Sequence, residues 1–161
     1  MLQLYCTLVE GGLVKYLGLD LGTRSLGISI SDLTKTVATT YGTVHFEEKS
    51  YEKALNELAT IVEKEPIEKF ILGYPLNMNG SVGPRAQETI GFKKMLEEKF
   101  NIEVELQDER LSTKEASGYM IKADMSRKKR KQKIDSLAAN IILQTYLDKM
   151  KGWKIWIIMK L

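Results

Sequence analysis

One short stretch near the start of the chain restricts its fold more than any other. Residues 15–22, KYLGLDLG, are typical of a buried strand, yet this apolar run leads directly into a carboxylate, Asp20. The next ten residues alternate Leu26, Ile28 and Ile30, which predicts a hairpin partner after a glycine-containing turn. Burying a carboxylate is costly unless a cation lies beside it. We therefore expect a basic group or a metal ion next to Asp20.

The hydrophobic pattern beyond this hairpin predicts a mixed α/β domain with the element order βββαβαβαα. The predicted strands are 15–22, 23–32, 39–46, 69–75 and 101–110. The predicted helices are 50–65, about 85–100, a helix that starts in 112–124, and 134–150. With 161 residues, the chain is long enough to bury one real core. We expect a single domain with a mixed five-stranded sheet flanked by helices.

The basic residues are concentrated in one segment. Lys and Arg number 24 against 21 Asp and Glu, but six of the 24 lie in SRKKRKQK, residues 126–133. Without those six, the remaining 18 leave the rest of the chain with a balance of −3. Such a patch suits a polyanion partner, although a solvated loop without a partner explains it equally well. The candidate phosphate contacts are Arg127, Lys128, Lys129, Arg130 and Lys131.

Composition excludes several other classes of protein. The single cysteine, Cys6, cannot form an internal disulfide, and with only one histidine, His45, there is no Cys/His zinc cluster. The sequence has no run of 18 apolar residues, so it predicts no transmembrane helix. Its first residues lack the basic region of a signal peptide. We therefore expect a cytoplasmic protein without a membrane partner.

Three acidic residues stand at positions where they could converge. Asp20 ends the first strand, Asp108 ends the last strand, and Asp135 begins the last helix. Period two places Asp108 on the apolar face of its strand and points Glu109 the other way. Converging carboxylates repel unless neutralised, and their oxygens suit Mg²⁺ or Mn²⁺, which can activate water in phosphodiester cleavage. A turn, an ion pair with Arg110 and a helix dipole are ordinary alternative explanations for the three acids.

Several polar residues flank these acids and are candidate substrate contacts. Thr23 and Arg24 follow Asp20, and Arg85 begins a helix whose N-terminus favours anions. Asn77 and Asn79 follow a strand, at the end where ligands of α/β sheets collect. Turn geometry alone also explains the Asn and Gly residues of that loop. Arg110 either binds phosphate or orients its acidic neighbours.

Four motifs together resemble one known family. These are YLGLDLGTRSLGISISD, GYPLNMNGSVGPRA, DERLST and SRKKRKQKIDSLAANIILQTYLD, and they look like the YqgF-type nucleases, the Holliday-junction-resolvase-like family also called RuvX. The resemblance implies a ribonuclease H-like fold and a divalent-metal nuclease that processes the 5′ end of the 16S rRNA precursor; a Holliday junction role has also been proposed for the family. It places the acidic positions at Asp20, the Asp108–Glu109 pair and Asp135. Strand periodicity makes Asp108 the preferred member of that pair, with Glu109 as the alternative.

Other interpretations remain open at this level. LGLDLGTRS also looks like the first phosphate loop of actin- and hexokinase-like ATPases, although a second glycine-rich nucleotide motif is missing. A non-catalytic nucleic-acid-binding module is a third interpretation. The expected partner is a nucleic acid, with structured RNA and branched DNA both open. A homodimer is also open at this level.

The two ends of the chain depart from the family pattern. Residues 1–13 are expected to be an N-terminal extension, 14–148 the nuclease domain and 149–161 a C-terminal tail. The extension could be a translated ribosome-binding sequence. The tail holds both tryptophans, and three roles stay open for it: packing on the body, pairing with another chain, or weak insertion into a membrane.

Overall fold

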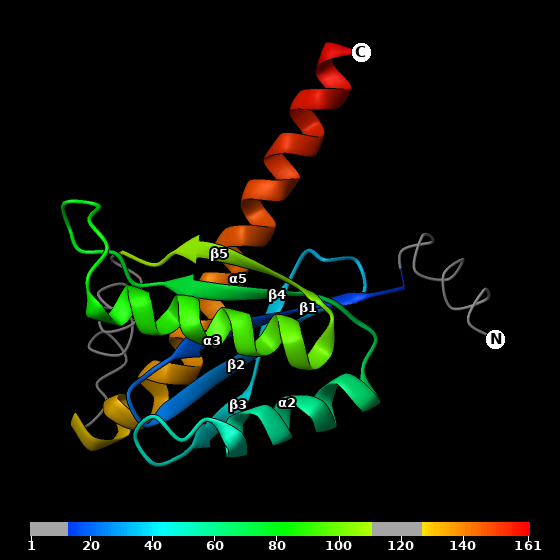
Figure 1. The fold of residues 1–161 in the computed structure, drawn as a ribbon. Coiled ribbons are helices and arrows are strands. Elements are labelled where there is room, and N and C mark those ends of the chain that lie inside the picture. Colours follow the sequence, from blue (N-terminus) through cyan, green and yellow to red (C-terminus); the bar gives the residue numbers. More distant parts are fainter. Residues whose placement is uncertain (1–12, 111–126) are drawn as a thin grey trace.

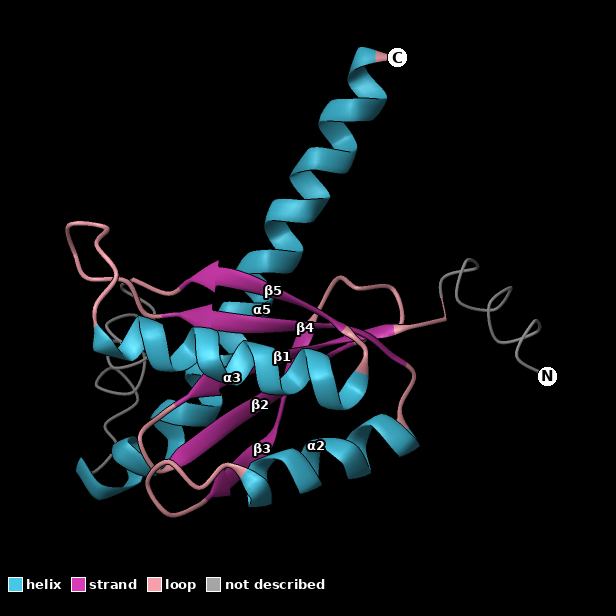
Figure 2. Cartoon of the chain, viewed as in Figure 1, coloured by secondary structure: helices cyan, strands magenta, loops and turns pink. Residues whose placement is uncertain are grey.

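The computed structural model of the protein describes residues 13–110 and 127–161, with side chains described from residue 137 onward in the second range. Helices α2 and α3 cover one face of a five-stranded sheet, and α5 crosses the other face (Figure 1; Figure 2). The strands are β1 Lys15–Leu21, β2 Ser25–Ser31, β3 Ala38–His45, β4 Ile67–Tyr74 and β5 Glu103–Asp108. The helices are α2 Glu52–Lys64, α3 Pro84–Phe100 and α5 Arg127–Lys160. The predicted single α/β domain with a mixed sheet is confirmed.

The strand pairing brings three strand ends to one edge of the sheet. The order is β3-β2-β1-β4-β5, with β1, β2 and β3 antiparallel to their neighbours in the hairpins. β4 runs parallel to both β1 and β5. The carboxyl ends of β1, β4 and β5 therefore lie side by side, and this edge is where the chain can assemble a site.

Alternation along β1 assigns its residues to two different layers. Leu17, Leu19 and Leu21 belong to the core beneath α2 and α3, so Gly18 and Asp20 face α5. Gly18 also permits close packing, since a Cβ there would lie 2.6 Å from Leu143 Cβ and 2.9 Å from the Ala139 carbonyl oxygen of α5. Ala138 and Ala139 of α5 are buried, and their small side chains also let the helix lie close to the sheet.

Polar contacts fix the middle of α5 to the sheet. The Tyr146 hydroxyl donates to Glu105 Oε2 at 2.7 Å, and Lys69 Nζ donates to the same oxygen at 3.2 Å. Burial and the bond to Glu105 raise the pKa of Tyr146 to about 12. Gln144 adds a contact with the start of β3, because its Oε1 accepts from the Ala38 backbone N–H at 2.8 Å. α5 is thus held tightly up to residue 147.

The last helix differs from the prediction at both ends. α5 runs over Arg127–Lys160 instead of 134–150, so the backbone of the basic segment from Arg127 is helical and the tail continues the same helix. No proline interrupts this stretch, which explains why the helix does not stop near residue 150. The other strands and helices match their predicted ranges within about two residues. The predicted helix in 112–124 and residues 1–12 of the predicted extension 1–13 lie outside the described residues.

Among the described helices, none is both long enough and apolar enough to cross a membrane.

Candidate active site

Two carboxylates meet at the edge where the parallel strands end. Asp20 stands near the end of β1, and Glu109 follows β5 directly. Their side chains are hydrogen-bonded to each other. The Glu109 backbone N–H donates to the Tyr74 carbonyl oxygen at 3.3 Å, which holds the chain beside the end of β4. This pair lies on the face of the sheet that α5 covers.

A glycine makes room for the Glu109 side chain. A Cβ at Gly73 of β4 would overlap the Glu109 carboxylate and would lie 2.6 Å from Ile142 Cδ1 of α5. Glu109 therefore lies directly over the β4 backbone, in a space that any larger residue at position 73 would fill. Gly73 is not among the site residues predicted from the sequence, because only three-dimensional packing shows its role.

The pair carries less negative charge than its two carboxylates suggest. Burial, followed by the negative charge of Asp20 and the hydrogen bond between the two groups, raises the pKa of Glu109 to about 8. The positive charge of Arg85 opposes this shift. In the protein alone, Asp20 and Glu109 therefore share a proton at neutral pH.

This proton predicts an unusual pH dependence of stability without added cations. Glu109 is protonated in the folded chain up to about pH 8 but ionises near its ordinary pKa of 4.5 in the unfolded chain. The folded state then binds more protons, so the free energy of unfolding should fall as pH rises from about 5 to 8. Urea unfolding in the presence of a chelator measures this slope. In Glu109→Gln the slope should flatten; an unchanged slope would mean that the two carboxylates do not meet.

Asp108 lies away from Asp20, so the structure pairs Asp20 with Glu109 and not with the preferred Asp108. It follows Val104 and Leu106 in period two, as predicted, but that face looks toward α3, whereas Asp20 faces α5. Asp108 is exposed and accepts from Arg110 Nε at 2.8 Å and Nη2 at 2.7 Å. The hydrogen bond and charge of Arg110 lower the pKa of Asp108. The structure therefore brings together Asp20 and Glu109, the predicted alternative.

Arg85 and Thr23 lie close to the carboxylate pair. Arg85 reaches from the first turn of α3 to the end of β1, where its Nη2 donates to the Leu21 carbonyl oxygen at 2.9 Å. Its Nη1 donates to Thr23 Oγ1 at 3.1 Å and lies 3.4 Å from Glu88 Oε2. Arg24 is exposed on the adjacent turn. The structure thus brings Arg85 to Thr23, three residues after Asp20, and their contact with a substrate stays a prediction.

The loop after β4 is shaped by its own side chains. Asn77 Nδ2 donates to Ser81 Oγ at 2.9 Å, and Asn79 Oδ1 accepts from the Ser81 backbone N–H at 3.0 Å. Gly80 adopts a φ of +83°, which favours glycine. Arg110 Nη1 donates to the Met78 carbonyl oxygen at 3.4 Å, which ties the loop to the end of β5. Turn geometry accounts for these asparagines, and their predicted contact with substrate is not tested by the fold.

Asp135 and the basic segment are placed by their backbone alone. They lie in the N-terminal part of α5, and Asp135 stands about one helical turn before Ala139, whose carbonyl oxygen accepts from Ser29 Oγ at 2.7 Å. The side chains of Asp135 and of residues 127–131 lie outside the described residues. Among the side chains that are described, no three Asp, Glu, His or Cys residues form a group suited to a metal ion.

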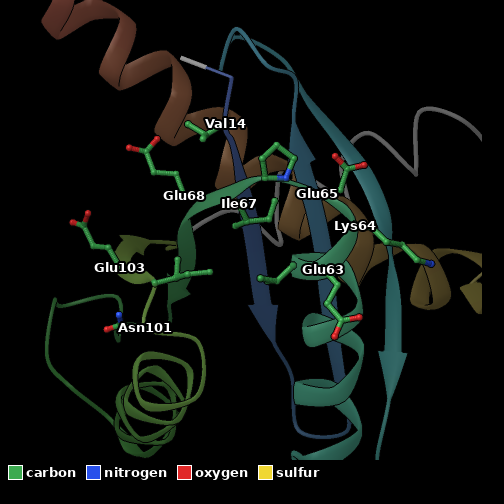
Figure 3. A pocket seen from close by; sticks show the side chains of 11 residues that line it. Val14, Glu63, Lys64, Glu65, Ile67, Glu68, Asn101 and Glu103 are labelled. Carbon is green, nitrogen blue, oxygen red and sulfur yellow. The ribbon is translucent and has the colours of Figure 1, made fainter. Parts of the chain in front are cut away.

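An acidic pocket lies at the opposite edge of the sheet and has the wrong charge for a nucleic acid. It has a volume of about 460 Å³ and is lined by the starts of β4 and β5 and the ends of α2 and α3 (Figure 3). Three of its four glutamates form ion pairs: Lys15 with Glu65 at 2.8 Å, Lys35 with Glu68 at 3.1 Å, and Lys69 with Glu103 at 3.6 Å. We therefore place the candidate site at the Asp20 edge.

Comparison with known proteins decides the family. The profile of the RuvX family, described as "Holliday junction resolvase", matches residues 14–149. The chain belongs to the RuvX family. Proteins named "Putative pre-16S rRNA nuclease" from Geobacillus sp. (strain WCH70) and Bacillus subtilis (strain 168) are 47% and 44% identical to it. The alignments cover 84% and 85% of this chain, and 98% and 99% of those proteins.

A solved structure shows the fold of this RuvX-family chain. "T. thermophilus RuvC in complex with Holliday junction substrate" superimposes with a TM-score of 0.53 at 13% identity, over 86% of this chain and 96% of that chain. The fold is therefore ribonuclease H-like, as the resemblance implied. Family membership also favours the nuclease interpretation over the ATPase one.

Proposed function

We propose that this RuvX-family protein is a divalent-metal-dependent nuclease that acts on the 5′ region of the 16S rRNA precursor. The observation that carries the proposal is the Asp20–Glu109 pair at the shared ends of parallel strands. Relatives at 44% and 47% identity are named for this reaction. Rigid strands hold the two carboxylates in place, as accurate positioning of reacting groups requires.

The donor set suits a hard cation. Asp20 and Glu109 supply carboxylate oxygens, the ligands that Mg²⁺ and Mn²⁺ prefer. Burial and then the negative charge of Asp20 raise the pKa of Glu109, and a bound cation would relieve the repulsion between the two carboxylates in place of the shared proton. When bound, such an ion activates water and stabilises the leaving oxygen of a phosphodiester.

Asp135 is the third proposed ligand, on the basis of helix direction. Tyr146 of α5 contacts Tyr16 at the start of β1, and Leu143 packs over Gly18 farther along the strand. Earlier residues of α5 therefore lie progressively nearer to the end of β1, where Asp20 stands. Asp135 precedes Ala139 by one turn on this course.

Arg85 has two roles in the proposed site. Its bond to the Leu21 carbonyl oxygen holds the backbone next to Asp20, and its positive charge acts on Glu109. The same guanidinium lies beside Thr23 at the exposed rim, where it can meet a substrate phosphate. Arg110 instead orients Asp108 and the loop after β4.

The basic segment is proposed to bind the phosphate backbone and to leave the chemistry to the carboxylates. Replacing Lys128, Lys129, Arg130 and Lys131 with glutamine should lower the log–log salt slope of RNA binding by about 0.7–0.9 per lost phosphate contact. Affinity should fall similarly for unrelated sequences, since phosphate contacts carry no base information. Binding titrations at several salt concentrations measure both effects.

A charge-matched variant controls for the loss of four positive charges. Lys49, Lys53, Lys64 and Lys94 are exposed on the opposite layer, and their replacement should leave the salt slope unchanged. Cleavage at saturating RNA should survive in both variants. An unchanged salt slope in the variant of the basic segment would show that this segment makes no phosphate contacts and is only the solvated start of α5.

The decisive experiment compares two substrates under matched conditions. Pure protein is incubated with a 16S rRNA precursor 5′ fragment and with a four-way DNA junction, each with Mg²⁺, with Mn²⁺ and with chelator. We expect metal-dependent cleavage of the RNA. Cleavage of the junction alone would support the second candidate, a resolvase, which the family description favours. Binding of either substrate without cleavage would indicate a non-catalytic module.

A further inference from the structure

The distal part of α5 has an unusual surface. Beyond Met150, every residue of the helix is exposed, and this part projects away from the sheet (Figure 1). Trp153 is 62% exposed, Ile158 70% and Met159 81%. Large apolar side chains in such number are rarely left in contact with water. This stretch, residues 151–161, is called the distal helix below.

The apolar side chains surround the distal helix completely. Residues 155–159, IWIIM, are consecutive and all apolar. Because successive positions of an α-helix are about 100° apart, five in a row cover the whole circumference. A partner helix or a groove would cover only one side of this stretch and would leave the other sides in water.

The charges of this region all have one sign. Every charged side chain in residues 149–161 is a lysine, at positions 149, 151, 154 and 160. Lys154 and Lys160 stand on either side of the apolar run, and Lys160 Nζ lies 4.9 Å from the centre of the Trp156 ring. Two copies of this helix would repel each other, whereas an anionic surface would attract it. Nucleic acid would account for the lysines and not for the apolar run.

We propose that the distal helix binds the surface of an anionic lipid bilayer. The apolar run 155–159 is about 7.5 Å long, so it can enter end-on the boundary of headgroups and acyl chains, a layer about 5–10 Å deep. Tryptophan favours the membrane–water boundary, and lysine stems extend so that their ammonium groups reach the headgroups. The bilayer surrounds the apolar side chains on all sides, as their distribution requires. The proposal is independent of the nuclease site.

Intrinsic fluorescence reports on this helix alone, since both tryptophans of the chain, Trp153 and Trp156, lie in it. The full chain is mixed with vesicles of equal parts phosphatidylglycerol and phosphatidylcholine, or with vesicles of pure phosphatidylcholine. We expect a blue shift of tryptophan emission and flotation with the anionic vesicles, and neither effect with the neutral ones. Absence of both effects with anionic vesicles would overturn the proposal.

Matched variants distinguish binding by the distal helix from nonspecific binding by exposed apolar or charged side chains elsewhere. Ile158→Glu should abolish flotation, whereas Met95→Glu, which alters an exposed apolar residue on α3, should not. Lys151→Gln combined with Lys154→Gln should weaken binding about 25-fold, as about fivefold per lysine predicts. The pair Lys53→Gln and Lys94→Gln, exposed on α2 and α3, should have little effect.

Two further results would count against a lipid surface. Flotation that survives Ile158→Glu would place the contact elsewhere on the molecule. A dimer in light scattering that Ile158→Glu dissociates, together with no vesicle binding, would assign the helix to a second copy of the chain. RNA cleavage by Ile158→Glu should equal that of the unmodified protein, which keeps this test separate from that of the nuclease site.

Discussion

Asp20→Asn is expected to abolish metal-dependent cleavage, with a loss of at least about 100-fold, the scale associated with removing one group that stabilises transition-state charge. Asparagine keeps the size of the side chain and removes its charge. Glu109 then loses the neighbour whose charge and hydrogen bond raise its pKa, so it ionises more easily. Single-turnover cleavage of precursor RNA with Mg²⁺ measures the loss.

The same substitution should not harm the fold. Without metal, relief of the repulsion between Asp20 and Glu109 should leave the free energy of unfolding above pH 8 unchanged or higher. Urea unfolding of the variant in chelator checks this. Full cleavage activity in a folded Asp20→Asn protein would remove Asp20 from the catalytic site.

Gly73→Ala is the second substitution with a large expected effect. The new methyl group would occupy the space of the Glu109 carboxylate and crowd Ile142 Cδ1. Both neighbours are the ends of flexible side chains, so the fold can adjust at a cost of about 1–3 kcal/mol. Glu109 cannot then keep its place beside Asp20, and a displacement of about 1 Å can cost about 100-fold in rate. Cleavage and urea unfolding, measured together, should show a larger loss of activity than of stability.

Gly91→Ala is the matched control. Gly91 lies in α3, and a Cβ there would meet nothing within 4 Å. Alanine should stabilise that helix by about 0.5–1 kcal/mol and leave cleavage unchanged. Equal activity in Gly73→Ala and Gly91→Ala would show that the position of Glu109 over β4 does not matter for the reaction.

Hydrophobic periodicity was sufficient to predict most of the fold. The alternation in β1 and β2 and the helical spacing in α2 and α3 place the large apolar side chains of each element on the face that packs in the core, so pattern and structure agree. The end of α5 was harder to predict, because it does not follow from burial. Its distal residues form no contact with the core, and an exposed helix gives no periodic signal.

The structure places Glu109 rather than Asp108 beside Asp20, for a reason that can be read in the sequence. Strand periodicity put Asp108 on the apolar face of the last strand. In β1, however, Leu19 and Leu21 take the apolar face, so Asp20 points the opposite way. On β5, Glu105 points toward α5, because it contacts Tyr146 of that helix. Glu109, four residues later, lies on the same face of the strand as Glu105. Matching the parity of the two strands would have selected Glu109; the need for Gly73 follows only from three-dimensional packing.

The most direct test of the proposed site compares Glu109→Gln with Asp108→Asn. Both substitutions remove one carboxylate charge from neighbouring positions, so each controls for the other. Cleavage of precursor RNA and Mn²⁺ binding by calorimetry are measured for both proteins. We predict that Glu109→Gln loses cleavage and binds Mn²⁺ more weakly, whereas Asp108→Asn keeps both properties. An active Glu109→Gln beside an inactive Asp108→Asn would contradict the site built on Asp20 and Glu109.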